Sequence, residues 1–170
     1  MRSVNRLLPV VSALAFGIVT AGCSSEQAAP TTPTIIAPPS VVETFTGALI
    51  TLGTNMHTFT VSQLGEVNVT LKATTLEPTI DAETGESIPP PDPTAVPALT
   101  LAVGSPTTSI FGPVCATLAF GGAPFLVETK AAATPQIKGS ALPGNLCVSF
   151  SDPNGHVTNV VDYTIVVAHP

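Results

Sequence analysis

Acidic side chains gather in one short segment, where their oxygen atoms could bind a hard cation such as calcium. Five carboxylates lie within residues 77–92: Glu77, Asp81, Glu83, Glu86 and Asp92. Their spacing lacks the Asp/Asn periodicity and the closing glutamate of an EF-hand loop. The segment also contains several prolines, so we interpret it as a solvated acidic loop between strands. Whether this loop binds a cation stays open.

Three histidines are the other candidates for chemistry. We assign His57 to the polar face of a strand, His156 to the end of a turn, and His169 to a position next to a proline. Zinc needs three or four converging ligands, and neither HExxH nor a paired Cys/His spacing appears. The sequence therefore predicts surface histidines and no metal site.

No catalytic set can be recognised. The chain has no GxSxG elbow and no glycine-rich phosphate loop. Paired carboxylates for glycoside cleavage cannot be identified from spacing alone. We therefore predict that the protein is not an enzyme and has no cofactor, with a small hydrolase as the least favoured alternative.

The amino terminus has the layout of an export signal. Residues 1–6 carry two arginines and no acid, and residues 7–22 are apolar or small apart from Ser12 and Thr20. As a helix, this stretch would rise only about 24 Å, less than the roughly 30 Å hydrocarbon core of a membrane. We predict a cleaved signal peptide over residues 1–22.

The signal segment ends in Val19-Thr20-Ala21-Gly22-Cys23. This stretch resembles the lipobox of bacterial lipoprotein precursors: Ala21, Gly22 and Cys23 match, while Thr20 stands where Leu is usual. The resemblance implies a diacylglyceryl thioether on Cys23 and a further acyl chain on its amine, which together form a stable membrane anchor. Ser24 is compatible with sorting to an outer membrane. The alternative is an ordinary signal-peptidase site beside an unmodified cysteine.

The net charge argues against anionic partners. Once residues 1–22 are removed, only Lys72, Lys130 and Lys138 oppose the 11 acids, which leaves a charge of −8. Such a chain has no electrostatic footprint for nucleic acid or for an anionic lipid surface.

The residues after the anchor predict a linker. Residues 23–42 are rich in Thr, Ser and Pro, and four prolines block helix and central strand alike. We predict a disordered, semi-extended tether of up to roughly 60 Å. It either holds the following domain clear of the bilayer or is a spacer of no particular length.

Residues 43–170 read as strands. Apolar residues alternate with polar ones in runs about ten residues apart, which glycines separate. The apolar positions are Phe59 and Val61; Val67, Val69 and Leu71; Leu99, Leu101 and Val103; Val114, Ala116, Leu118 and Phe120; Phe125 and Val127; Leu146, Val148 and Phe150; and Val161, Tyr163, Ile165 and Val167. Asp152-Pro153-Asn154-Gly155 predicts a hairpin turn between the last two runs. We expect an all-β domain of about eight strands, folded as an antiparallel two-layer sandwich.

Two cysteines remain for a disulfide if Cys23 carries lipid. Cys115 and Cys147 form an even pair in an oxidising compartment. Each is out of phase with the apolar residues of its own run, so both sulfur atoms should point away from the core. We predict a disulfide between neighbouring strands across the outer surface of a sheet, with two free thiols as the alternative.

Several strand segments together resemble a known family. These are residues 43–49, 57–61, 67–71, 144–152 and 163–170. They are similar to bacterial pre-peptidase C-terminal (PPC-like) domains, in particular short envelope versions with a cysteine pair. The resemblance implies a jelly-roll-like sandwich that is usually non-catalytic and accompanies secreted enzymes or binds polymers and surfaces. Family members that bind calcium use a run of Asp residues, and the corresponding segment 98–104 has none.

The combined expectation is a lipid-anchored protein of the bacterial cell envelope, held in the outer membrane through Cys23. Its sandwich would face the periplasm or the surface and serve adhesion, polymer binding or partner binding, with an envelope protein or polysaccharide as ligand. A structural or accessory subunit of an envelope complex is the alternative, and a small envelope hydrolase the least favoured one.

Overall fold

The computed structural model describes residues 40–117, 119–120 and 123–170. By its internal contacts the chain divides into two units, residues 1–35 and residues 36–170. All of the described residues belong to the second unit. The predicted signal peptide and Cys23 lie outside the described residues.

The described part is all-β and contains no helix. Its strands are β1 (Val41–Leu49), β2 (Thr54–Val61), β3 (Gly65–Leu76), β4 (Thr79–Ile80), β5 (Ser87–Ile88), β6 (Leu99–Ser109), β7 (Gly112–Thr117), β8 (Ala119–Phe120), β9 (Ala123–Pro124), β10 (Leu126–Thr129), β11 (Ile137–Ala141), β12 (Gly144–Ser151) and β13 (Val161–His169). Strand β1 begins two residues before the domain boundary that we predicted at 43.

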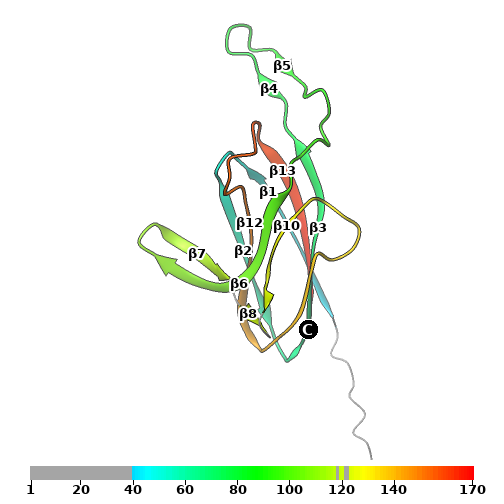
Figure 1. The fold of residues 1–170 in the computed structure, drawn as a ribbon, viewed down its shortest axis with the longest axis vertical. Helices are drawn as coiled ribbons and strands as arrows, with labels where there is room; N and C mark the ends of the chain where they lie inside the picture. The colour runs from blue at the N-terminus through cyan, green and yellow to red at the C-terminus, as the bar shows by residue number, and fades with distance from the viewer. Residues whose placement is uncertain (1–39, 118, 121–122) are drawn as a thin grey trace, which may run out of the picture. The chain divides into compact units, whose positions relative to one another are not determined.

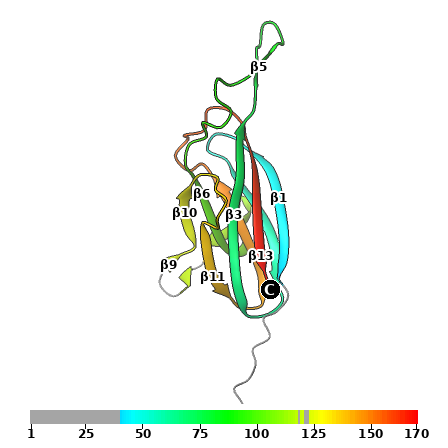
Figure 2. The same cartoon turned by 90° about the vertical axis from the view of Figure 1, so that its right-hand side faces the viewer.

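Two antiparallel sheets make up the body of the unit. Sheet A has the order β1-β13-β3-β11, and sheet B has the order β10-β6-β12-β2, with β7 added to β6. Figures 1 and 2 show the two sheets as facing layers. In sheet A the pairing of β13 with β3 shifts between Thr164 and Ile165, and Lys72 is left without a partner across the strands. This bulge keeps the apolar residues of β3 directed inward.

The hydrophobic core lies between the sheets and draws on both of them. Most of the apolar positions that we predicted belong to it, from Phe59 and Val61 on β2 to the alternate residues of β13. Phe125 and Val127 pack at its margin. The prediction of an all-β, sandwich-like fold is thus confirmed. Five core members lay outside the runs we predicted: Leu49, Val96, Ile137, Ala141 and Val157.

The predicted hairpin at residues 152–155 is wrong. A turn does form there, with Gly155 at φ 69°. However, β12 belongs to sheet B and β13 to sheet A, so the loop carries the chain from one sheet to the other. A turn signal in the sequence specifies a local change of direction and not the sheet in which the next strand pairs.

Asp152 organises this loop. Its side chain is 1 % exposed, and it accepts hydrogen bonds from the backbone N–H groups of His156 (2.8 Å), Val157 (3.0 Å) and Leu52 (3.3 Å). Leu52 lies in the β1–β2 turn at a positive φ of 57°. Burial alone would raise the pKa of Asp152, but the hydrogen bonds from Val157, His156 and Leu52 outweigh it and hold the pKa below its usual value. One carboxylate therefore ties two loops together.

Candidate binding surface

The second half of β6 leaves the body of the unit. Its first residues pair with β12 and β10, but beyond Gly104 only β7 remains beside it. The result is a two-stranded hairpin, β6–β7, which Figure 1 shows projecting from the layers. A free two-stranded ribbon is only marginally stable in water. This hairpin therefore needs a brace where it joins the sheet.

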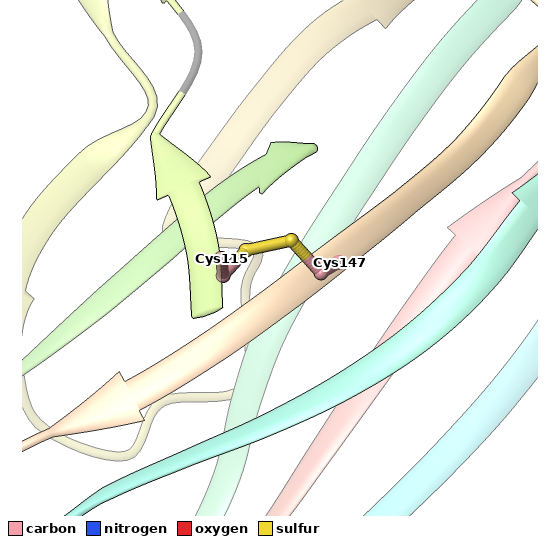
Figure 3. The surroundings of a disulfide bond; sticks show 2 residues. All are labelled: Cys115 and Cys147. Atoms are coloured by element: carbon pink, nitrogen blue, oxygen red, sulfur yellow. A yellow bond between two sulfur atoms is a disulfide. The ribbon is translucent and has the colours of Figure 1, made fainter. Parts of the chain in front are cut away.

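A disulfide provides that brace. Cys115 on β7 is bonded to Cys147 on β12, with their Cα atoms 5.8 Å apart (Figure 3). Cys147 is fully buried and alternates with the inward-facing Leu146 and Val148, so the bond lies on the outer face of sheet B, as predicted. It links two strands that each pair with β6 but not with each other, so the prediction of a bridge between neighbouring strands is wrong.

Gly104 lets β7 reach Cys147. A Cβ atom on this residue would clash with the backbone carbonyl of Ala116 on β7. No residue other than glycine lets the β7 backbone cross so close to β6 at this point. The glycine and the disulfide together fix where the hairpin leaves the sheet.

The tip of the hairpin is apolar and almost fully exposed. Ile110 and Phe111 occupy the two turn positions and are 94 % and 93 % exposed. The Ser109 hydroxyl accepts a hydrogen bond from the Phe111 N–H (3.1 Å) and donates one to the Gly112 carbonyl (3.0 Å). Gly112 has a φ of 115°, which lets the chain return into β7. The turn thus satisfies polar backbone groups from within.

The residue types in this turn are unusual for an exposed turn. Glycine, asparagine, aspartate and proline dominate exposed turn positions, yet here two large apolar side chains point into solvent. No Asp, Glu, Lys, Arg or His occurs between Asp92 and Glu128, although the chain as a whole is strongly acidic. Val114, 39 % exposed, extends the apolar surface along β7. Residues that depart from local sequence–structure preferences without a gain in packing are expected at functional sites. We therefore take the β6–β7 hairpin as the candidate binding surface.

The prediction that Val114 and Ala116 face the core is wrong. Both are exposed, because β7 belongs to the projecting hairpin and has no second layer opposite it. Leu118, which we placed in the same run, lies outside the described residues.

His57 is partly buried and His169 is buried, which corrects our interpretation of both as surface histidines. His57 shares the inward phase of Phe59 and Val61; its ring stacks on Phe45 (centroids 4.9 Å apart) and its Nε2 lies 2.9 Å from the Tyr163 hydroxyl. Burial lowers the pKa of His57. Since Phe45 lies on β1 and His57 on β2, the pair closes the side of the molecule where an edge of each sheet is open.

His169 is also buried. It continues the inward alternation of β13, is 3 % exposed, and places its Nε2 2.8 Å from the Glu43 carboxylate on β1. Its ring packs against Phe59. His156 alone is exposed. The three rings lie in separate surroundings, and within the described residues no group of three or more His, Cys, Asp or Glu side chains converges as metal ligands would.

The acidic residues 77–92 form an exposed extension that includes the β4–β5 ribbon (Figure 2). Asp81 accepts hydrogen bonds from the backbone N–H groups of Glu83 and Thr84, and these bonds lower its pKa. Asp92 bonds the N–H and hydroxyl of Thr94 in the same way, which lowers its pKa too. These two carboxylates cap turns of their own extension.

A shallow hollow of about 450 Å³ lies on the outer face of sheet A. Its lining includes the hydroxyl groups of Thr46, Thr75 and Thr164 and the carboxylate of Asp162. The charge on Asp162 raises the pKa of the nearby Glu77. Hydroxyl and carboxylate groups on a flat, small-residue surface can hydrogen-bond a sugar, so the hollow is a weaker candidate for polymer binding.

Fold and hairpin define this part of the chain as an all-β, sandwich-like domain with a disulfide-braced apolar arm. Comparison with known protein families found no matching family model, and comparison with curated proteins found no match. Within the described residues, no helix is long and apolar enough to cross a membrane.

Proposed function

We propose that this chain is a lipid-anchored protein of the bacterial cell envelope whose β domain is a non-catalytic binding module. The β6–β7 hairpin is the observation that carries the binding role: it is braced by a disulfide, free of charge and tipped by two exposed apolar residues. The anchor rests on the lipobox-like stretch that ends at Cys23. A disulfide that braces an extended arm also suits an oxidising compartment such as the periplasm or the cell surface.

The proposal includes a fold relationship. The domain is a jelly-roll-like member of the PPC-like group, carried on a tether that follows Cys23. Support comes from the strand segments that resemble the group and from the facing antiparallel sheets. Outer-membrane sorting is supported by Ser24 after the modified cysteine.

A direct test of the anchor is Cys23→Ser in the producing bacterium. The wild-type protein should sediment with membranes and carry fatty acid on its first mature residue, as seen by mass spectrometry. The variant should appear in a soluble fraction. Unchanged membrane partitioning, or a native protein without acyl chains, would contradict the anchor.

The binding role needs a separate test. A photo-crosslinking amino acid at position 111 should capture a defined envelope component in intact cells, whereas the same amino acid at position 80, an exposed isoleucine on β4, should not. Capture of a single protein would favour an accessory role in an envelope complex. If polysaccharide were the ligand, binding should instead be lost on Asp162→Ala in the sheet A hollow.

A further inference from the structure

The β6–β7 hairpin has the properties of a segment that enters an apolar medium. Placing a polar backbone group in hydrocarbon without a partner is costly. At this tip the Ser109 hydroxyl accepts from the Phe111 N–H and donates to the Gly112 carbonyl, while the flanking residues pair across the ribbon. Two backbone groups of the turn, the Phe111 N–H and the Gly112 carbonyl, are therefore bonded within it and do not depend on water.

Charge distribution points to the same use. Charged side chains are expensive to bring into a membrane interface, and the 35 residues from 93 to 127 contain none. The chain's acids all lie outside this stretch. The net charge of −8 would repel an anionic surface, so the suitable target is a zwitterionic lipid surface.

We propose that the tip of this hairpin, Ile110 with Phe111, inserts into the lipid interface of the membrane that holds the anchor. The proposal deepens the proposed function by naming the partner of the arm as lipid. Transfer of two large apolar side chains out of water favours insertion of the tip. The β6–β7 hairpin is thus a second point of membrane attachment for the domain, in addition to the acylated Cys23.

The length of the chain before the domain permits this contact. Residues 24–40 separate Cys23 from β1 and can span roughly 53 Å at ~3.1 Å per residue. The longest strand, β3, has 12 residues and is about 40 Å long at ~3.3 Å per residue. A tether longer than the longest strand lets the domain turn until the hairpin faces the bilayer. Once tethered, the tip samples the interface at high effective concentration, so two side chains suffice.

The test uses the absence of tryptophan from the chain. Phe111→Trp places a single fluorescent reporter at the tip, and Ile80→Trp places one on another exposed two-stranded ribbon of the same domain as the matched control. The mature chain from Ser24, which contains the complete core, is held on phosphatidylcholine vesicles by an amino-terminal histidine tag and a nickel-chelating lipid. This attachment is independent of acylation, so its outcome is separate from that of Cys23→Ser.

The expected result is a blue-shifted emission and strong quenching of Trp at 111 by brominated acyl chains, with neither effect at 80. Adding Ile110→Ser should weaken insertion about 30-fold, which corresponds to the loss of one buried isoleucine side chain. Anionic phosphatidylglycerol should weaken insertion as well.

Three outcomes would overturn the proposal. Trp at 111 could remain unquenched, both reporters could be quenched equally, or Trp at 111 could respond only after envelope proteins are added. The last result would assign the tip to an apolar socket on a protein. None of these outcomes bears on whether Cys23 is acylated.

Discussion

Replacing Asp152 by alanine is expected to destabilise the domain by about 4 kcal/mol. Its carboxylate accepts two short hydrogen bonds, from His156 and Val157, and a longer one from Leu52. Hydrogen bonds to a charged group contribute roughly 1.5–3 kcal/mol each. The two short bonds supply most of the figure, and the longer one adds little. Because domains are stable by only about 5–15 kcal/mol, this loss is a large share of the total.

Urea unfolding followed by far-UV circular dichroism measures this loss as a lower midpoint with an unchanged slope. Asp92→Ala is the matched control, since Asp92 also accepts a backbone N–H, from Thr94 at 2.8 Å, but is exposed. The control should change stability by no more than about 0.5 kcal/mol. A loss below about 1 kcal/mol for Asp152→Ala would refute the idea that this carboxylate joins the two loops.

The pH dependence of stability is a second test of the role of Asp152. The folded-state pKa of Asp152 is lowered, so its contribution is complete above the unfolded pKa of about 3.9 and is lost as pH falls through the folded pKa. Wild-type protein should therefore lose stability below about pH 4 more steeply than Asp152→Asn, which carries no ionisable group there. Parallel profiles for the two proteins would count against the argument.

Two further predictions concern the base of the hairpin. Reduction of the Cys115–Cys147 bond, which spans 32 residues, should lower the free energy of unfolding by about 3.7 kcal/mol in the chain-entropy model. Urea unfolding with and without reductant measures this loss. The stability of the double variant Cys115→Ala, Cys147→Ala should not change when reductant is added. Gly104→Val should cost at least about 2 kcal/mol, because its side chain meets the β7 backbone, and should slow disulfide formation as followed by thiol titration during refolding. Thr107→Val, exposed on the same hairpin, should do neither.

The sequence was sufficient to predict the strands that lie in the sandwich, because a strand with one buried face alternates apolar and polar residues. Leu101 and Val103 on β6 and Ile165 and Val167 on β13 are buried as the alternation predicts. The same rule would have placed His169 inside had its phase been followed to the end of β13. Its polar ring is accommodated there because Glu43 lies opposite.

Alternation did not reveal which strands lack a second layer. Val114 and Ala116 alternate as core residues do, yet their exposure depends on where β12 and β10 stop pairing with β6. That endpoint is set by the sheet as a whole and is not encoded near residue 114. Strand β11 escaped notice for the opposite reason, since Ile137 and Ala141 are its only apolar side chains.

The candidate surface was missed for a related reason. An Ile110-Phe111 pair between two β runs looks like part of a core, and only the turn geometry shows both side chains in water. The one signal available was the long uncharged stretch from 93 to 127 in an acidic chain. The cysteine pairing was predictable because residues 43–170 contain just two cysteines, which leaves each with one possible partner there.

The position of β13 has a consequence for how the molecule is made. This strand lies between β1 and β3, and its residues from Val161 to His169 pair with β1 along its whole length, Leu49 to Val41. Sheet A thus has a gap at its centre until residue 169 is available, however early the first strands are synthesised. Completion of sheet A therefore waits for the last strand of the domain, and folding should have the slow kinetics typical of distant strand pairing.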